Sequence, residues 1–341
     1  MEKKKIKVLI SFVVGVLLFI GVIIYLGPES FLHIYENIDL TYLPPFAFFT
    51  TLVFATYVWR FQYVMHAYKK KSSFWVQFKQ TISSFAVSYV TPSVRIGGEP
   101  LRVYMLKKEN NIDIKTGTSI VIIDKFIEFT GSLLFGIIGM ILIMFIPGVP
   151  LYGKSLLFLA LLAGFFVLFF VYYFTIRDGS GPFTYMLELL RFYRFPKWRK
   201  LKSPVVMVEK KMEKFFREHK KEFIIGMIFY VLSGLAMYYE TKFMLLLLGM
   251  SVGFTDIVLI IVVWGAINFI PVPAALGFQE VGQSGLFAII FGAGEVGLAF
   301  SLISRIRSLI FVALGFSFIS GFTGEQVMRK LDEKAKKKKI E

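Results

Sequence analysis

The chain alternates long runs of apolar residues with short charged segments. A helix needs about 20 largely apolar residues to cross the hydrocarbon core of a bilayer. Six runs reach that length and predict membrane-spanning helices: 7–26, 42–65, 117–146, 154–176, 222–249 and 298–323. The first run is longer than the apolar part of a signal peptide, and no small-residue cleavage site follows it, so we interpret it as a retained span. The pattern predicts an all-α integral membrane protein.

Two further apolar segments are interrupted in the middle by proline and glycine. They are Thr81–Tyr104 and Asp256–Phe291. A straight helix cannot continue through such a break, and irregular backbone at membrane depth is tolerated only where protein or water surrounds it. We expect four prolines to make the breaks: Pro92, Pro100, Pro271 and Pro273.

The distribution of lysine and arginine sets the orientation in the membrane. Of the 39 basic residues, 33 fall in segments that would share one side: 1–7, 66–80, 95–116, 177–222 and the tail from 324. Basic loops mark the cytoplasmic side, so we expect a multi-pass protein of the cell membrane with both termini in the cytoplasm. The first broken segment must then enter and leave on the cytoplasmic side, and the second must do so on the external side.

The prediction is therefore six spans and two oppositely oriented re-entrant hairpins in a single polytopic domain, 1–341. An alternative with eight ordinary spans keeps the same termini but exports the basic loop 95–116. Residues 177–221 form a basic segment with apolar positions at helical spacing, as in helices that lie on an anionic membrane surface. A solvated linker is the other interpretation of that segment. The tail 324–341 is expected to be a basic cytoplasmic anchor.

Composition excludes several classes of protein. The chain is 56% hydrophobic and only 18% charged, whereas a soluble chain is usually about a quarter charged. The net charge of +16 lies beside apolar spans, so it is a topology signal and does not indicate nucleic-acid binding. There is no cysteine, which excludes disulfides and thiolate metal sites.

The two broken segments share an internal spacing. Pro92 precedes Glu99 by seven residues, and Pro273 precedes Glu280 by seven. A charged residue then follows each glutamate by 25 residues: Asp124 in the first case and Arg305 in the second. Because the two halves start on opposite sides, they would form inverted repeats, about 42–146 and 222–323. Paired interrupted segments of this kind point to a transporter's binding site at the membrane midplane, although a chance match of spacings is the simpler alternative.

The tips of the two hairpins have the chemistry of an anion site. A new helix is expected to begin near Glu99 and near Phe278. The free amides and the positive dipole end of a half-helix attract anions, and glycine lets a phosphate approach the backbone closely. A lipid phosphate is therefore a reasonable guest.

Ionisable residues inside the predicted spans define the candidate site, since such groups normally face a polar cavity or each other. We expect a lipid head group to be bound by four arginines and three glycines: Arg60, Arg102, Arg305, Arg307, Gly97, Gly98 and Gly277. Five residues would balance or gate these charges: Glu99, Asp124, Lys125, Glu128 and Glu280.

A purely structural interpretation stays open beside this one. Ion pairs such as Arg305 with Asp124 would then only fix how the helices pack, and the pattern at Glu240 and Lys242 favours that interpretation. Arg60, near the end of its span, would in that case reach toward the aqueous interface.

The same stretches resemble the transmembrane, flippase-like region of the lysylphosphatidylglycerol synthase family. The matching residues are Pro92, Ile96–Arg102, Ile123–Glu128, Ile270–Glu280 and Ser304–Arg305, and the resemblance covers nearly the whole chain. The family usually has Glu-Arg where this chain has Asp124-Lys125, which keeps the charge signs. It usually has two glycines where this chain has Ala274-Ala275, which leaves less room for a ligand at the second tip.

The resemblance implies translocation of an anionic, aminoacylated or polyprenyl-linked lipid head group, by a stand-alone member that lacks the soluble synthase domain. Two alternatives are a membrane-embedded enzyme acting on a lipid phosphate and a lipid-presenting partner of a glycosyltransferase. The three histidines, His33, His66 and His219, are scattered without metal-ligand spacing. We therefore expect a transporter of phosphate-bearing membrane lipids, without a cofactor, a metal or a nucleic-acid partner. Nothing in the sequence indicates an oligomeric state.

Overall fold

The structure is a computed structural model of the chain and describes residue 24 and residues 38–92, 96–145, 151–176, 181–191 and 202–338. These residues form eleven α-helices and two short 3-10 helices, with no strand among them. The bounds are η1 Leu40–Tyr42, α3 Leu43–Ala67, α4 Phe74–Val90, α5 Glu99–Glu109, α6 Ile114–Met144, α7 Leu151–Ile176, α8 Pro182–Leu189, α10 Lys202–Glu218, α11 Lys220–Leu247, α12 Phe254–Ile267, η3 Pro273–Ala275, α13 Phe278–Phe291 and α14 Gly294–Lys338. The prediction of an all-α protein is confirmed.

Five of the described segments are long and apolar enough to cross a membrane. Four of them are the predicted spans that now form α3, α6, α11 and the first part of α14, Gly294–Gly321. The fifth is Pro273–Phe291, which the sequence assigned to half of a broken hairpin. The predicted span 154–176 forms α7, in which Leu161–Thr175 is a shorter apolar stretch. The predicted span 7–26 lies outside the described residues apart from Ile24.

Both helix breaks occur at the proline- and glycine-containing segments where the sequence predicted them. α4 ends at Val90 and α5 begins at Glu99, with Pro100 in its first turn, where a missing amide costs nothing. In the second half α12 ends at Ile267, the 3-10 turn η3 follows, and α13 begins at Phe278. The expected starts of the two half-helices are therefore confirmed.

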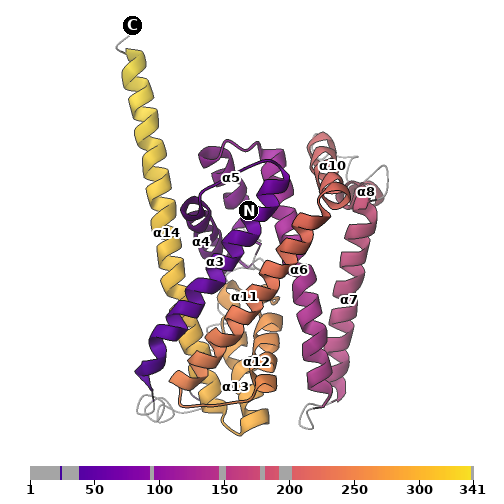
Figure 1. Cartoon of the computed structure of the whole chain (residues 1–341), viewed down its shortest axis with the longest axis vertical. Coiled ribbons are helices and arrows are strands. Elements are labelled where there is room, and N and C mark those ends of the chain that lie inside the picture. Colours follow the sequence, from indigo (N-terminus) through magenta and orange to yellow (C-terminus); the bar gives the residue numbers. More distant parts are fainter. Residues whose placement is uncertain are drawn as a thin grey trace.

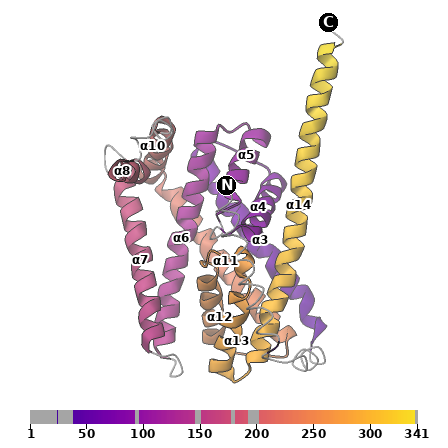
Figure 2. The same cartoon turned by 180° about the vertical axis from the view of Figure 1, so that it is seen from behind.

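The long helices and the broken pairs have a crossed arrangement. α3 and α11, one from each half of the chain, pack along their length. α4 and α5 lie toward the end of the bundle at which α14 leaves it, whereas α12 and α13 lie toward the other end (Figures 1 and 2). α4 packs against α14, and α12 packs against α6. Each broken pair thus contacts the long helix of the other half.

α10 packs part of its apolar face against protein. Met212 and Phe215 on its apolar face are fully buried in a cluster with residues of α3 and α6, such as Phe61 and Ile120. Protein thus covers this part of the apolar face of α10, and the membrane-surface interpretation of the helix stays a prediction. The pattern of amphipathic spacing is the same for both environments, which is why the sequence did not distinguish them.

A buried carboxylate attaches α8 to α10. Glu209 of α10 accepts hydrogen bonds from the backbone amides of Phe183 and Thr184, at 2.7 and 2.9 Å, which caps the start of α8. On α8 itself Met186 and Leu189 stay exposed. The membrane-surface interpretation of 177–221 thus stays a prediction for α8.

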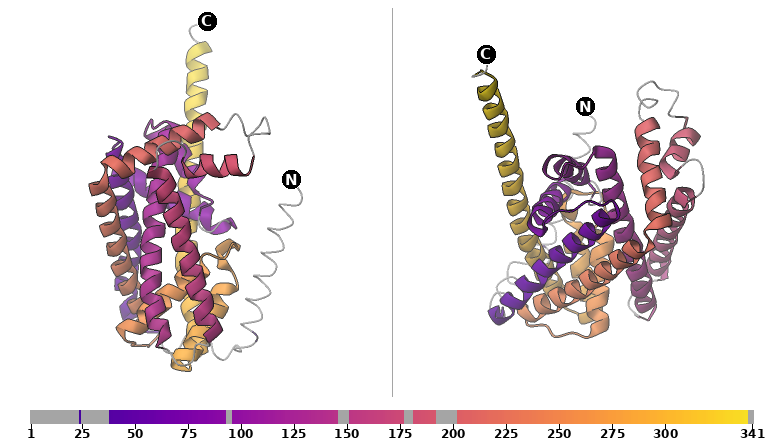
Figure 3. Two further views of the ribbon diagram at one scale, coloured as in Figure 1. Left: turned by 90° about the vertical axis from the view of Figure 1, so that its right-hand side faces the viewer. Right: turned by 45° about the horizontal axis from the view of Figure 1, so that its top comes forward.

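The outer faces of the bundle carry large apolar side chains. Phe166 and Phe169 of α7 are 66% and 63% exposed. Contiguous exposed apolar surface on this scale is rare on a soluble monomer and fits contact with lipid. α14 continues past the other helices as a single helix, as both views of Figure 3 show.

Candidate functional site

The two breaks meet at a cavity in the interior of the bundle. Thr91 of the first break and Val272, Ala274 and Ala275 of the second contribute to its wall. The cavity measures about 130 Å³. One water needs roughly 10–15 Å³ of such volume, so the cavity has room for several waters or a small polar group. Its remaining wall comes from α3, α4, α5, α6, α11, α12 and α14, so both halves of the chain enclose it.

Asp124 of α6 is the centre of the first charged cluster. Its carboxylate accepts two hydrogen bonds from Arg60 of α3, at 2.8 Å from Nε and 3.2 Å from Nη2. The same Nη2 also donates to Glu128, one helical turn further along α6, at 3.1 Å. Arg60 is only 2% exposed, so its side chain does not reach toward the aqueous interface and that interpretation is wrong.

Arg102 of α5 approaches Asp124 from another direction. One guanidinium nitrogen lies 3.6 Å from Asp124, and another donates to the hydroxyl of Thr81 at 3.0 Å. The guanidinium also lies over the ring of Phe61, 3.5 Å from its centroid. Arg102 is only 4% exposed. A cation–π contact stabilises a desolvated cation of this kind, so the Phe61 ring helps to offset the cost of burying the guanidinium.

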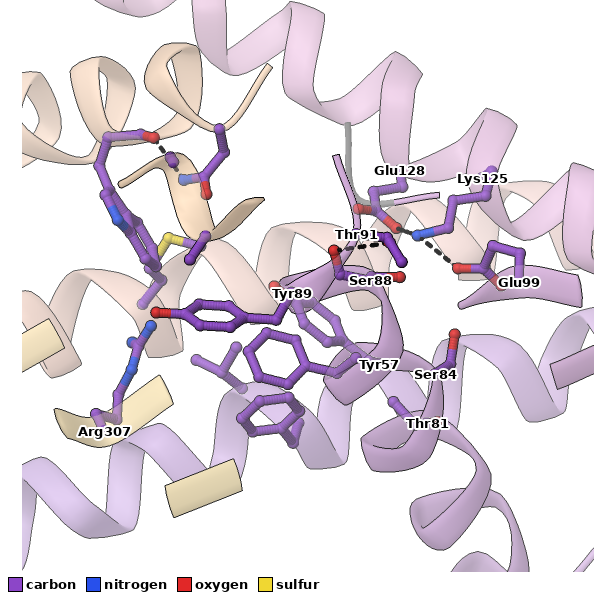
Figure 4. A pocket seen from close by; sticks show the side chains of 18 of the residues that line it. Tyr57, Thr81, Ser84, Ser88, Tyr89, Thr91, Glu99, Lys125, Glu128 and Arg307 are labelled. Atoms are coloured by element: carbon purple, nitrogen blue, oxygen red, sulfur yellow. Dashed lines mark hydrogen bonds and ion pairs between the residues drawn. The ribbon is translucent and has the colours of Figure 1, made fainter. Parts of the chain in front are cut away.

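Lys125 lies between two carboxylates. Its ammonium is 3.0 Å from Glu99, the first residue of α5, and 3.0 Å from Glu128, as Figure 4 shows. Glu99 is buried, whereas Lys125 and Glu128 keep about a third of their side-chain surface exposed, 27% and 31%. One cation is therefore shared by two acids at the wall of the cavity.

A second cluster lies in the opposite part of the wall. Arg307 of α14 forms an ion pair with Glu240 of α11. Glu240 also accepts a hydrogen bond from Thr50 at 2.7 Å, and the guanidinium of Arg307 lies 5.0 Å from the centroid of the Trp264 ring. The phenol of Tyr89 points toward Arg307 across the cavity (Figure 4). This pair joins α11 to α14 at the cavity.

Arg305 contacts the second break rather than the first charged cluster. Its guanidinium forms an ion pair with Glu280 of α13 rather than with Asp124. It also donates to the backbone carbonyls of Ala274 and Ala275, at 3.2 and 3.4 Å. Its side chain is not part of the cavity wall. Arg305 instead fastens the turn of the second break to α14.

That turn needs such support because its backbone is strained. Ala274 and Ala275 both have positive φ, 56° and 47°, a region that residues with a Cβ seldom adopt. Gly277 has a φ of 78°, and its amide donates to Glu280 at 2.9 Å. Glycine at Gly277 is therefore explained by backbone conformation.

Gly98 is explained by packing between the arms of the first broken pair. Its amide donates to the hydroxyl of Ser88 at 2.9 Å. A Cβ at this position would lie 1.9 Å from the carbonyl oxygen of Ser84 in α4. Backbone cannot move away as a flexible side chain can, so α4 and α5 approach this closely only because residue 98 is glycine.

Gly98→Ala should therefore force the two arms apart. We expect a loss of unfolding free energy of about 3 kcal/mol, at the upper end of what overpacking costs. The matched control is Gly285→Ala in α13, where a Cβ meets nothing within 4 Å and alanine should be neutral or slightly stabilising. Thermal unfolding of both variants in detergent measures the difference. Equal midpoints would show that the close approach of α4 and α5 does not exist.

The predicted site residues fall into two groups, those that line the cavity and those that do not. Seven line it: Arg60, Arg102, Arg307, Glu99, Asp124, Lys125 and Glu128. Arg305, Glu280 and the three glycines Gly97, Gly98 and Gly277 do not. Pro92 and Pro100 flank the first break, and Pro271 and Pro273 flank the turn of the second.

Sequence reasoning missed several side chains of the wall. Glu240 was assigned to packing, yet it lines the cavity opposite Asp124's cluster. Tyr57, Tyr89 and Trp264 also line it, and nothing marks them in a chain that is 17% aromatic. Only Tyr89 could have been singled out from the sequence, because it lies next to the first break.

Comparison with known proteins decides the family. The family model described as lysylphosphatidylglycerol synthase TM region matches residues 8–315. The chain belongs to this family. It is also 24% identical over 327 residues to a protein of Methanothermobacter thermautotrophicus described as a UPF0104 membrane protein, covering 92% of this chain and 93% of that relative. No solved structure matches the chain. The family is one of membrane proteins associated with lipid handling, and this chain has several helices apolar enough to span a membrane. The chain is therefore a membrane protein.

Proposed function

We propose that the chain moves a phosphate-bearing lipid head group across the cell membrane through the cavity between its two halves. The observation that carries this is a pair of unpartnered donors. Nη1 of Arg60 and Nε of Arg102 are buried and have no hydrogen-bond partner among the described residues, and both side chains line the cavity. Buried guanidinium donors need an acceptor, and a phosphate is the acceptor that arginine's planar fork fits best.

The proposed topology follows the crossed arrangement of the helices. α4 with α5 would be a re-entrant hairpin on the cytoplasmic side, and α12 with α13 a second hairpin on the external side. Their positions toward opposite ends of the bundle support this (Figures 1 and 2). Together with α3, α6, α11 and α14 they would form inverted repeats, about 42–146 and 222–323, with both termini in the cytoplasm.

The head group would be anionic, aminoacylated or polyprenyl-linked. The cavity is lined by charges and hydroxyls in a bundle whose outside is apolar, so the polar head would pass inside while the acyl chains stay in lipid. No group of three or more metal-binding side chains occurs within the described ranges. We propose transport because the polar cavity lies between the two halves of an apolar bundle, which suits the passage of a head group.

Reconstituted protein tests the proposal. Vesicles of phosphatidylcholine with a trace of fluorescent phosphatidylglycerol are made with and without the purified chain, and dithionite reports how much label is outside. We expect the chain to expose nearly all of the label, whereas empty vesicles expose about half. A matched protein control carries Gly98→Ala, which is expected to separate the arms of the first hairpin. Equal exposure with the native chain and with empty vesicles would refute the proposal.

A further inference from the structure

The cavity wall is balanced in formal charge before any guest arrives. It carries four basic side chains, Arg60, Arg102, Lys125 and Arg307, and four acidic ones, Glu99, Asp124, Glu128 and Glu240. A phosphodiester that enters adds a negative charge, and among the described residues of the wall no cation is left over to neutralise it. An uncompensated charge in a desolvated site is costly, and such sites take up or release a proton instead. The bound state therefore calls for one proton.

The hydrogen bonds of the wall single out the acid that would receive this proton. Asp124 accepts from Arg60 through both oxygens and has Arg102 beside it. Glu240 accepts from Arg307 and from Thr50. Glu128 accepts from Arg60 and Lys125 and is 31% exposed to solvent. Each of these carboxylates has at least two partners that stabilise its negative charge.

Glu99 has far less support. Its Oε1 pairs with Lys125 alone, and its Oε2 is buried without a hydrogen-bond partner among the described residues. The residue is 7% exposed. Lys125 is its paired cation, and the carboxylate lies in the first turn of α5, at the positive end of the helix dipole.

Lys125 is the cation that a guest would take away from Glu99. Its ammonium is already shared with Glu128 and its flexible stem is 27% exposed. A lipid phosphate that binds the free donors of Arg60 and Arg102 lies in the same cavity and offers Lys125 a further anionic acceptor. When the ammonium turns toward the phosphate, Glu99 loses its cation.

Within the described part of the chain, the charged side chains that line the cavity beside Glu99 come from three helices. α6 contributes Asp124, Lys125 and Glu128, α3 contributes Arg60, and α5 itself contributes Arg102. None of the described α4 side chains that line the cavity carries a charge: Thr81, Ser84, Ser88 and Tyr89 carry hydroxyls, and the fifth is Phe85. Of these side chains only Arg60 and Arg102 are cations that could replace Lys125 beside Glu99, and either would have to leave Asp124 to do so.

We propose that Glu99 takes up a proton from water when a lipid phosphate binds, so that head group and proton occupy the cavity together. This rests on the proposed function and adds its energy coupling, because a carrier that binds both would use a proton gradient to drive the lipid. The proton comes from water on the open side and bonds to the free Oε2 of Glu99. It returns to water on the other side when the phosphate leaves.

Calorimetry on the purified full chain in uncharged detergent tests the linkage. The probe is dihexanoyl phosphatidylglycerol, whose phosphodiester does not titrate near neutral pH, and the buffers are Tris and HEPES, which differ in ionisation enthalpy. We expect uptake of about one proton per lipid, and an affinity that rises by up to about tenfold for each unit the pH falls. Dimethyl phosphate tests for the head group alone, and equal affinity for it would assign the site to a free phosphodiester and contradict a lipid carrier.

Two neutral isosteres locate the proton. Glu99→Gln should bind the probe without proton uptake and with an affinity independent of pH, whereas Glu128→Gln should still take up a proton. Binding by the native chain without proton uptake, or uptake that persists in Glu99→Gln, would overturn the inference and leave the proposed function standing. No binding of the probe by the native chain would contradict the proposed function itself. The pH dependence of the native chain decides the matter even if a variant does not fold.

Discussion

Arg305→Gln should lower the free energy of unfolding by about 3–5 kcal/mol, the cost of leaving one partner of a buried ion pair alone. Glu280 is fully buried and forms its ion pair with Arg305. The turn at Ala274 and Ala275 would also lose the donors that hold its two strained residues. The thermal midpoint in detergent, followed by tryptophan fluorescence, measures the loss.

A double variant separates the ion pair from the general effect of substitution. Glu280→Gln with Arg305→Gln removes both charges and should recover part of the stability lost in the single variant, because no buried charge is left without a partner. Arg217→Gln is the matched surface control, since Arg217 is 44% exposed beside Glu213, and it should change stability by less than about 1 kcal/mol. If the double variant is no more stable than Arg305→Gln, the pair does not hold the turn.

Arg102→Gln should lower the affinity for dihexanoyl phosphatidylglycerol about 10- to 100-fold, because it removes charge-assisted hydrogen bonds worth about 1.5–3 kcal/mol. Arg102 is a better choice than Arg60 for this test. Asp124 keeps the two hydrogen bonds from Arg60, at 2.8 and 3.2 Å, when Arg102 is changed, so the cluster retains its main support. Transport of the fluorescent lipid should fall together with affinity.

The same titration on Arg217→Gln gives the control for a lost positive charge elsewhere. An affinity for Arg102→Gln within a factor of two of the native value would show that this arginine only packs against Phe61 and Thr81. A fall in the thermal midpoint as large as that of Arg305→Gln would assign Arg102 to folding rather than to binding.

The sequence predicted the course of the chain well where single residues dictate the backbone. Pro100 marks the start of α5 because proline suits the first turn of a helix. Gly277 marks the start of α13 because glycine permits the positive φ found there. Apolar runs of sufficient length fixed α3, α6 and α11. The environment of α10 was not predictable, because its spacing of apolar residues fits a protein core and a lipid surface equally.

The sequence singled out seven residues that line the cavity, but not the contacts that they make. Arg60, Arg102 and Asp124 stand out since charges inside apolar spans are rare, and all three line the cavity. Which acid each arginine meets depends on the rotation of packed helices, which no spacing in the sequence records. Arg305 meets Glu280 for this reason, and Glu240, taken for a packing residue, lines the cavity with Arg307.

Two arginines on α14 act on different neighbours from almost the same place. Arg305 and Arg307 are two residues apart and therefore point about 200° from one another around the helix axis, one to Glu280 of α13 and the other to Glu240 of α11. A turn of α14 about its axis cannot release one contact without displacing the other. The two ion pairs therefore couple the rotation of α14 to both α11 and α13.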